Sequence, residues 1–501
     1  MGEKSEKVTG FIQKQTLSDE GHSPRKRISL KHKMVCVILI AFAYLLIGAT
    51  APFLRFPHIT SETMADFDTA IFRQSSSKAE RAALLETNES AWEERIRLLA
   101  KAKERVILST FDMRKGESTK DILAMLLARA DEGVKVRILV DGFSGAVRME
   151  GQELFYALSS HPNVEIRTYN PLNLFKPWKL QGRMHDKYMI VDDKAYILGG
   201  RNTFDYFIGT YTDKNVSRDR EVLIFNTEPG SEETSLHELM TYFESVWALD
   251  VCKSFHNEER LAEKPKVQEQ RTMLKARYEK LVKDYPQLFD ESWDYQEHTL
   301  EAGSIHLISN PTGIYAKEPE VFCKLVQLMK EAEERVVIQS PYVVCNSYMC
   351  EQLTLLKEAV PNTKLLLNSV ENGDNFVASS DYIRNKEKII ATGIPLYEYD
   401  GGISNHGKSI LIDDDLSVIG SYNMDLRSSY LDTELMLVIE SRELNQELEG
   451  YMNEMEADSR RVLLDGSYEV PDHITVEKVP LWKRAAWGIT GFLLQPFRML
   501  I

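Results

Sequence analysis

Cysteine is scarce in this chain, and the few cysteines form no recognisable metal or redox pattern. The 501 residues include five cysteines, with no Cys-x-x-Cys pair and no zinc-ligand spacing. Their sparse distribution is also unlike the framework of a disulfide-stabilised domain. We therefore look for the function outside redox chemistry, and we expect neither a metal nor a cofactor.

Positive charge is scarce outside the N-terminus. The chain has 61 Lys and Arg against 76 Asp and Glu, a net charge of −15, and residues 1–33 carry +4, which leaves −19 on the rest. Binding of a nucleic-acid backbone is driven by cationic side chains that release counterions. The acidic body therefore argues against a nucleic-acid partner, although a small basic cleft is compatible with it. The 43% hydrophobic and 27% charged content is that of a globular protein.

One stretch lacks charge altogether. Residues 34–54, MVCVILIAFAYLLIGATAPFL, are long enough to cross the hydrocarbon core of a membrane as a helix. Basic residues precede this stretch and acidic residues follow it, so the positive-inside rule predicts a single-pass anchor in the cell membrane, with residues 1–33 as a cytoplasmic tail and the catalytic body outside the cytoplasm. A cleaved signal peptide is the alternative, because Ala49-Thr50-Ala51 resembles a cleavage tripeptide.

The C-terminal segment combines aromatic and basic residues. Residues 465–501 include Trp482, Trp487 and Phe492 close to Lys483 and Arg484. This composition predicts an amphipathic helix in the headgroup region of a membrane. A terminal helix packed on the body is the alternative, because a short apolar helix suits either role.

Between these ends, strand-like runs alternate with helical patterns, which is typical of βαβ organisation. Residues 55–90 are predicted to form a polar stalk, residues 91–250 a first half, residues 251–302 a helical connector and residues 303–464 a second half. The predicted strands are Val106–Thr110, Val134–Val140, Val164–Tyr169, Lys187–Val191, Ala195–Leu198, Val222–Phe225, Ile305–Ile308, Val336–Gln339, Lys364–Leu367, Leu396–Tyr399, Ser409–Ile412, Ser417–Ile419 and Glu434–Ile439.

The two series of strands are copies of one unit. Residues 97–109 align with 327–339 at a constant offset of 230, and residues 185–192 align with 406–413 at an offset of 221. An internal repeat turns two weak motifs into one strong one. We therefore expect an α/β fold made of two pseudo-symmetric halves around one cleft.

Each copy contains the pattern His-x-Lys-x4-Asp-x6-Gly-x-x-Asn. On a strand, positions i and i+2 share a face, so His and Lys point the same way, and the glycine permits a turn that brings Asn beside them. The aspartate has the opposite parity and is expected to point away, into a salt bridge or a turn. The members of the two copies are His185, Lys187, Asp192, Gly199 and Asn202, and His406, Lys408, Asp413, Gly420 and Asn423.

These residues resemble the paired HKD motifs of the phospholipase D superfamily, over roughly residues 91–464. The stretch Gly420-Ser-Tyr-Asn-Met-Asp-Leu-Arg-Ser, with Glu434 after it, is similar to the second motif of bacterial cardiolipin synthases. Gly200 stands where that group usually has Ser, and Asp432 where Asn is common. The resemblance implies a duplicated phospholipase D-like sandwich that acts on phospholipids at a membrane.

Two histidines in one cleft suit the exchange of a phosphodiester through a covalent phosphohistidine, which splits one difficult displacement into two. A neutral imidazole attacks phosphorus while a protonated imidazole donates to the leaving alkoxide. By analogy with the superfamily, His185 is the nucleophile and His406 the acid, although the near-symmetry leaves the reverse open. The catalytic set is His185, Lys187, Asp192, His406, Lys408 and Asp413; Lys187, Asn202, Lys408 and Asn423 are expected to bind phosphate oxygens, and Glu221 and Glu434 to orient the histidines.

The favoured hypothesis is a phosphatidyltransferase that converts phosphatidylglycerol to cardiolipin and releases glycerol. A phospholipase D that hydrolyses phospholipid to phosphatidic acid is the close alternative, because it differs only in whether alcohol or water resolves the intermediate. A nuclease with the same core is disfavoured by the acidic body and the membrane signals. A catalytically inactive scaffold is disfavoured because both motifs keep every reactive group.

Overall fold

The computed structural model describes residues 29–74, 79–212, 216–476 and 478–501. The chain divides into two units, Met1–Leu46 and Ile47–Ile501. Most of the basic tail expected at residues 1–33 lies outside the described residues.

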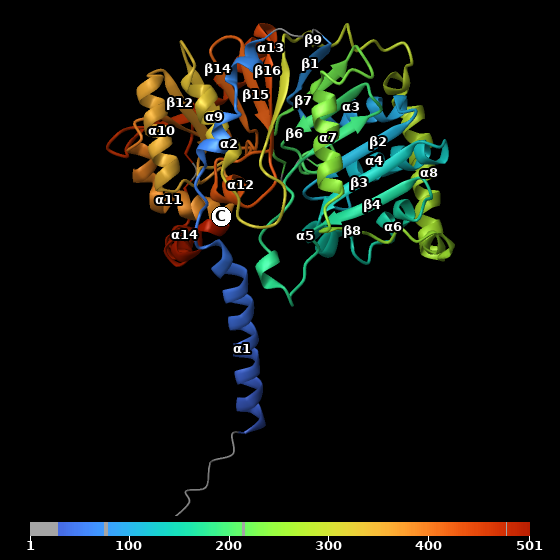
Figure 1. The fold of residues 1–501 in the computed structure, drawn as a ribbon, viewed down its shortest axis with the longest axis horizontal. Helices are drawn as coiled ribbons and strands as arrows, with labels where there is room; N and C mark the ends of the chain where they lie inside the picture. The colour runs from blue at the N-terminus through green and yellow to red at the C-terminus, as the bar shows by residue number, and fades with distance from the viewer. Residues whose placement is uncertain (1–28, 75–78, 213–215, 477) are drawn as a thin grey trace, which may run out of the picture. The chain divides into compact units, whose positions relative to one another are not determined.

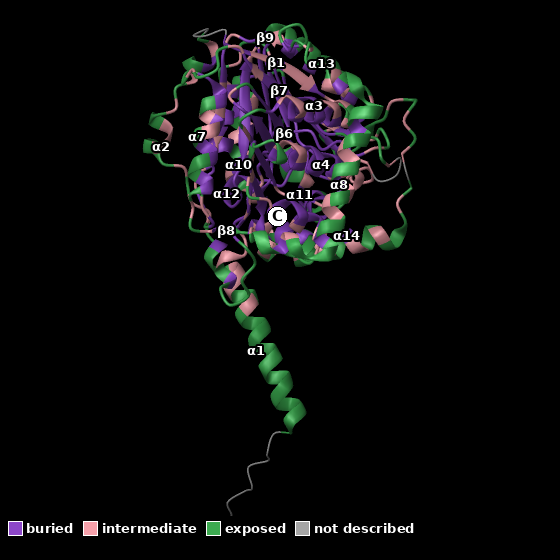
Figure 2. Cartoon of the chain, turned by 90° about the vertical axis from the view of Figure 1, so that its right-hand side faces the viewer, coloured by how far each residue is buried: buried purple, intermediate pink, exposed green. Residues whose placement is uncertain are grey.

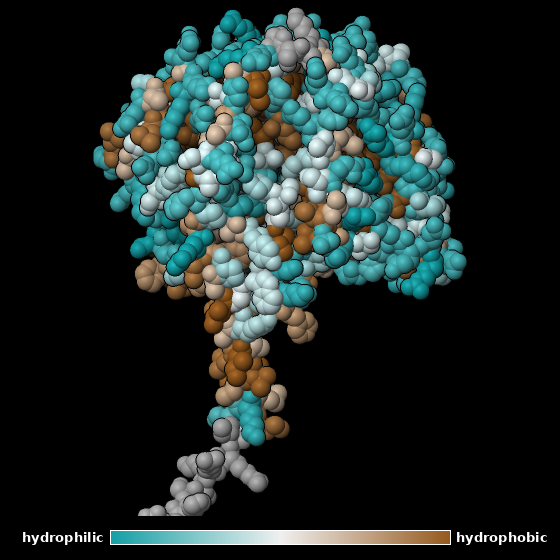
Figure 3. Space-filling model, in the orientation of Figure 1, coloured by the Kyte–Doolittle hydropathy of each residue, from teal (hydrophilic) through white to brown (hydrophobic). Residues whose placement is uncertain are grey.

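The first unit contains most of helix α1 (Leu30–Thr50), which has no buried residue and is exposed over most of its length (Figure 2). Apolar side chains line it (Figure 3). Within the described part of the chain, the helical stretch Leu30–Phe53 is the one segment long and apolar enough to cross a membrane. The apolar helix predicted from residues 34–54 is therefore present, and it begins four residues earlier.

The second unit contains two nine-stranded sheets (Figure 1). The first has the order β8-β4-β3-β2-β5-β6-β7-β1-β9 and the second the order β10-β16-β15-β14-β11-β12-β13-β17-β18. The strands of the first sheet are β1 (Glu80–Leu85), β2 (Arg105–Thr110), β3 (Lys135–Asp141), β4 (Val164–Tyr169), β5 (Tyr188–Val191), β6 (Ala195–Gly199), β7 (Glu221–Asn226), β8 (Cys252–Ser254) and β9 (Leu300–Glu301). Those of the second are β10 (Ile305–Ser309), β11 (Val336–Gln339), β12 (Thr363–Asn368), β13 (Leu396–Tyr399), β14 (Ser409–Ile412), β15 (Leu416–Gly420), β16 (Leu435–Glu440), β17 (Ser459–Val462) and β18 (Tyr468–Glu469).

The two sheets share one topology. In each, three strands are parallel, β2, β3 and β4 in the first and β11, β12 and β13 in the second. An antiparallel run, β5-β6-β7 or β14-β15-β16, follows on the other side of β2 or β11. The duplication expected from the sequence is therefore present in the fold.

Helices cover the outer faces of both sheets, because the strands are buried on both faces and carry continuous apolar runs. On the first half these are α3 (Asn88–Lys101), α4 (Glu117–Asp131), α6 (Glu153–Ser159) and α8 (Pro265–Asp284); on the second, α9 (Glu320–Lys330), α10 (Ser347–Ala359) and α11 (Phe376–Ile390). A third core lies between the sheets and joins residues of both halves with α7 (Ser235–Trp247) and α13 (Arg442–Ala457). The shorter helices are α2 (Ser61–Ala65), α5 (Gly142–Ser144) and α12 (Leu426–Tyr430).

Part of the segment expected to be a stalk belongs to the body instead. Strand β1 pairs with β7 along its whole length, and the Glu80 carboxylate accepts hydrogen bonds from the backbone of Ser235 and Leu236 at the start of α7. Phe53 and Phe72 are buried in the core of the second half. The sequence pattern did not predict strand β1, because it starts with two charged residues, Glu80 and Arg81.

The C-terminal helix α14 (Leu481–Leu493) packs on α11. Trp487 and Gly491 are buried there, and a side chain at Gly491 would collide with the Ser380 carbonyl. Trp482 and Phe492 are instead exposed to about 73% and 63%. One face of the helix is therefore packed on the body, and the opposite face presents apolar side chains to the exterior.

Candidate active site

Each HKD motif is bonded to a segment of the opposite half. Each motif precedes a central strand, β5 or β14, and Met184 bridges to Thr433 while Asn405 bridges to Arg218. The His185 amide donates to the Thr433 hydroxyl at 3.2 Å, and the His406 amide donates to the Arg218 carbonyl at 2.6 Å. Each motif is therefore positioned by the opposite half.

His185 is oriented by a carboxylate of the second half. Its Nδ1 lies 2.8 Å from Glu434 Oε1, and the Glu434 side chain is fully buried. The hydroxyls of Ser421 and Ser428 each donate to Glu434 at 2.5 Å, which fixes the carboxylate. The ring of Phe111 covers His185 with 5.1 Å between ring centres. The position of Glu434 is the one the sequence predicted for a histidine-orienting residue.

His406 is oriented by Asp219 and not by Glu221. His406 Nδ1 lies 2.7 Å from Asp219 Oδ2, whereas both Glu221 oxygens accept from Arg95 at 2.7 Å. The expectation for Glu221 is wrong because its side chain is committed to this buried ion pair.

The strand register shows why the sequence reasoning missed Asp219. Gly199 pairs with Glu221, whereas its counterpart Gly420 pairs with Met436. The structural counterpart of Glu434 is therefore Asp219, because each lies two residues before the partner of its motif glycine. The separation between glycine and partner is 22 residues in the first half and 16 in the second, a difference of six. Counting back two residues from the strand residue that pairs with the motif glycine finds both carboxylates.

The position of the Asp219 side chain explains why residue 200 is a glycine, where bacterial cardiolipin synthases usually have serine. A Cβ atom at Gly200 would lie 2.2 Å from the Asp219 carboxylate. In the second half, Ser421 occupies the equivalent position and donates to Glu434. The two halves therefore use one position differently: one leaves room for a carboxylate, and the other supplies a hydroxyl to it.

Both motif lysines are buried against their histidines. Lys187 donates to the His185 carbonyl, and Lys408 Nζ lies 2.5 Å from the His406 carbonyl and 2.7 and 3.1 Å from its ring nitrogens. Burial lowers the pKa of Lys187 to about 7 and also lowers the pKa of Lys408. An anionic phosphate group bound here would favour the ammonium form of both lysines, because opposite charges interact more strongly in a buried site than in water.

The motif asparagines follow β6 and β15. Asn202 Oδ1 accepts from the Asp112 amide at 3.1 Å. Asn423 is buried, and its Oδ1 has no hydrogen-bond partner within the described residues. Among the described residues, no hydrogen bond joins either asparagine to a motif histidine, so their predicted phosphate-binding role stays a prediction.

The two histidine–carboxylate pairs differ electrostatically. Burial raises the pKa of Glu434 to about 8, against the opposing charge of Lys187. Burial also acts to raise the pKa of Asp219, but Lys408 and His406 outweigh it and lower that pKa to about 2. Burial lowers the pKa of both histidines, that of His185 well below its ordinary value. An ionised Asp219 supports an imidazolium at His406 better than Glu434 supports one at His185.

The motif aspartates point away from the histidines. Asp192 accepts from the backbone amides of residues 103–105 at 2.8–2.9 Å, and Asp413 accepts from those of residues 333–335 at 2.8–3.2 Å. Both have positive φ, near 54° and 53°. Their place in the catalytic set is therefore structural, since each fixes the chain before a central strand, as their strand parity predicted.

Within the described ranges, no group of three or more His, Cys, Asp or Glu side chains has the arrangement of a metal site. The side chains gathered at the motifs are two imidazoles, two ammonium groups and two carboxylates. This set can bind an anion, supply a nucleophile and transfer a proton.

Comparison with known proteins identifies similar chains. The sequence is 26% identical to cardiolipin synthase C of Escherichia coli K12 over 72% of this chain and 82% of that protein. It is 27% identical to an uncharacterized protein of Helicobacter pylori over 72% of this chain and 76% of that protein. The crystal structure of phosphatidylserine synthase from Haemophilus influenzae has the same fold, with a TM-score of 0.59, 15% identity, and 92% of this chain and 99% of that chain covered.

The family described as cardiolipin synthase, PLD-like domain, matches residues 96–247 and 325–456, which is more than half of the chain and includes both HKD motifs. The resemblance and the fold class inferred from the sequence are confirmed. The chain therefore belongs to the PLD-like domain family of cardiolipin synthases.

Proposed function

We propose that the chain is a membrane-anchored phosphatidyltransferase that converts two molecules of phosphatidylglycerol to cardiolipin and glycerol through a phosphohistidine. The observation that carries the proposal is the pair of motif histidines, a buried His406 and a half-buried His185, each held by a carboxylate of the opposite half beside a buried lysine. The family match and the cardiolipin synthase relative support the choice of a phospholipid substrate.

In the first step, a neutral His185 attacks the phosphorus of the donor lipid through Nε2. The P–N bond forms, the bond from phosphorus to the glycerol headgroup breaks, and His406 gives its proton to the glycerol oxygen. Asp219 stabilises the imidazolium at His406 before this transfer, because its pKa near 2 keeps it ionised. Lys187 and Lys408 offset the negative charge on the phosphate oxygens.

In the second step, the neutral His406 removes the proton from a hydroxyl of a second phosphatidylglycerol. That oxygen attacks phosphorus and the P–N bond breaks, which yields cardiolipin and restores both histidines. If water takes the place of the alcohol, the product is phosphatidic acid, and the chain is a phospholipase D.

The membrane topology is part of the proposal. We propose that α1 spans the cell membrane with residues 1–33 in the cytoplasm, so that the body lies outside it. The exposed apolar face of α14, with Trp482 and Phe492, would then contact lipid headgroups. A reporter fused after residue 501 that is active only in the cytoplasm would contradict this orientation.

The test uses full-length protein in phosphatidylglycerol vesicles, with lipid products resolved by mass spectrometry. We expect cardiolipin and free glycerol from the wild type and neither from His185→Ala or His406→Ala. His237→Ala, an exposed histidine outside the site, is the control and should keep full activity. Phosphatidic acid without cardiolipin would make the protein a hydrolase, and no turnover of lipid would refute the proposal.

A further inference from the structure

The two halves differ in the connection that flanks each catalytic histidine. In the second half, residues 310–319 link β10 to α9, whereas in the first half only residues 86–87 link β1 to α3. The strands β4 and β13 end at equivalent tyrosines, Tyr169 and Tyr399, which face Asp141 and Asn368 on the neighbouring strands. These tyrosines allow the two flanks to be compared directly.

The flank beside His185 is filled. The Tyr169 hydroxyl donates to the Gly313 carbonyl at 2.8 Å, in the middle of the long connection. Ile314 is buried, and its backbone lies so close to Gly182 that a Cβ atom there would come within 2.4 Å of it. Residues 310–319 therefore act as a plug between the first motif and the second half.

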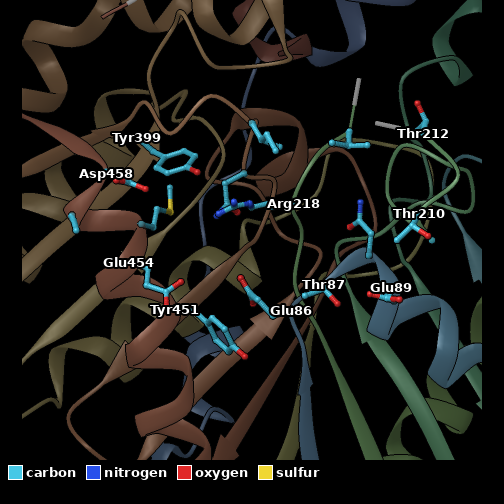
Figure 4. Close-up of a pocket in the computed structure, with 17 residues that line it drawn as sticks. Glu86, Thr87, Glu89, Thr210, Thr212, Arg218, Tyr399, Tyr451, Glu454 and Asp458 are labelled. Carbon is cyan, nitrogen blue, oxygen red and sulfur yellow. The ribbon is translucent and has the colours of Figure 1, made fainter. Parts of the chain in front are cut away.

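The flank beside His406 is open. A cavity of about 940 Å³ lies where the plug has no counterpart. Tyr399 is 1% exposed and lines this cavity, yet its hydroxyl has no hydrogen-bond partner among the residues described. Figure 4 shows that this hydroxyl points toward Arg218 in the cavity.

The cavity wall is directly connected to the general acid. Asn405 precedes His406, Arg218 precedes Asp219, and both Asn405 and Arg218 line the cavity. The Arg218 carbonyl accepts the hydrogen bond of the His406 amide. A molecule held in this cavity would therefore lie next to the backbone that positions both His406 and its carboxylate.

The charges in the cavity select a chemical class of ligand. Its lining includes four carboxylates against one guanidinium, that of Arg218. Glu86 is paired with Arg220 at 2.6 and 2.9 Å, whereas Glu454 and Arg218 form no ion pair within the part of the chain that is described. Carboxylates accept hydrogen bonds from hydroxyl and ammonium groups and repel anions, so the cavity favours a polyol or an amino alcohol.

We propose that this cavity binds the headgroup of the alcohol that leaves and enters through His406. The inference rests on the proposed function, because a general acid that protonates the leaving alcohol and then deprotonates the acceptor has both alcohols on its own side. On the side of His185, the corresponding position is occupied by residues 310–319, which pack against Tyr169 and Gly182. The asymmetry of the two flanks thus assigns the acceptor to the side of the second motif.

The test compares acceptors of different size on full-length protein in phosphatidylglycerol vesicles, with added glycerol, ethanolamine or methanol as competing alcohol. Ala457→Trp fills the cavity from the exposed end of α13, and Glu454→Gln removes one of its carboxylates. Asn453→Trp and Glu443→Gln, on α13 but outside the cavity, are the matched controls.

We expect the KM for glycerol and ethanolamine to rise about tenfold in Ala457→Trp and roughly threefold in Glu454→Gln, the latter being the effect of one hydrogen bond. Transfer to methanol and hydrolysis to phosphatidic acid should stay at the wild-type rate, because these acceptors are too small to need the cavity. The rate of transfer to added glycerol is then compared with the rate of transfer to phosphatidylglycerol of the vesicle. This comparison shows whether the cavity binds a free alcohol or a lipid headgroup.

If glycerol, methanol and water react at equally reduced rates, or if none of the rates changes, the cavity is not an acceptor site and the inference fails. A wild-type protein that turns over no lipid at all would instead refute the proposed function, and with it this inference.

Discussion

The position occupied by Gly200 and Ser421 shows how one residue adapts each half to its own carboxylate. Gly200→Ala places a methyl group where the Asp219 carboxylate lies, 2.2 Å from its oxygen. We expect Asp219 to be displaced from His406 and lipid turnover to fall by about 10- to 100-fold, the usual range for loss of one acid–base or orienting contact.

Gly450→Ala is the control for this substitution, because a Cβ atom at Gly450 meets nothing within 4 Å. It should leave turnover unchanged and stabilise helix α13 slightly. Turnover measured at saturating phosphatidylglycerol checks both variants. Wild-type activity in Gly200→Ala would show that Asp219 does not depend on this space.

Asp219 and Glu221 are two residues apart but have separate tasks. Asp219→Asn removes the charge that supports the His406 imidazolium, so lipid turnover should fall at least 100-fold, with the fold retained. Glu221→Gln breaks a buried ion pair with Arg95 and leaves a charge uncompensated. It should lower the free energy of unfolding by roughly 3–5 kcal/mol.

Denaturant unfolding and turnover, measured on both variants, separate the two roles. Loss of activity in a stable Glu221→Gln variant would instead favour Glu221 as the orienting residue. The sequence could not decide between them, because both acidic residues lie at the start of β7 and only the register places one beside His406.

At the scale of the elements, the tyrosines that end β4 and β13 give a matched pair of substitutions. Tyr169→Phe removes a hydroxyl that is bonded to Gly313, so it should lower the free energy of unfolding by about 1 kcal/mol or more. Tyr399→Phe removes a hydroxyl with no partner among the described residues, so the stability should stay the same or rise.

Chemical denaturation of the two variants beside the wild type measures this difference. Equal destabilisation by both substitutions would mean that the Tyr399 hydroxyl has a partner after all, and that the two flanks are less different than their connections indicate.

Most central strands could be predicted from the sequence because they are buried on both faces. The apolar runs of β11 and β14, and the alternating patterns of β4 and β13, predict these four strands to the residue. Strand β1 was missed because Glu80 and Arg81 open it and only four apolar residues follow. Its Glu80 is buried by tertiary contact with α7, which no local pattern reveals.

The residues of the repeated motif could be predicted from the sequence, but not all of their carboxylate partners could. The spacing of the repeated motif identified His185, Lys187, His406 and Lys408, and the parity of a strand separated them from Asp192 and Asp413. The carboxylate partners were harder to find, because each belongs to the opposite half. A contact between halves depends on loop length, and the extra six residues before β7 moved the first partner out of the expected position.

At the scale of the whole molecule, several buried carboxyl groups link stability to pH. Burial raises the pKa of Glu80 and Asp425 to about 7 and that of Asp141 and Asp186 to about 6. Between about pH 4.5 and these values, the folded protein binds protons that the unfolded chain has released. The free energy of unfolding should therefore fall as the pH rises from about 5 to 7, by roughly 1.4 kcal/mol per pH unit for each group that is still below its raised pKa.

Denaturation midpoints at pH 5, 6 and 7 check this expectation. Glu80→Gln should flatten the profile, because it removes one group with a raised pKa and keeps an acceptor for the amides at the start of α7. Stability that increases from pH 5 to pH 7 would show that these carboxyl groups are ionised in the folded protein.

Each half supplies the carboxylate that holds the histidine of the other half, so activity depends on assembly of the two halves. A half that folds by itself holds a histidine and a lysine but lacks the acid that aligns the imidazole, since Glu434 serves His185 and Asp219 serves His406. Activity can therefore emerge only once both halves have docked. During synthesis, the first half alone would be inactive, and activity would begin only when enough of the second half has folded to bring β16 beside the first motif.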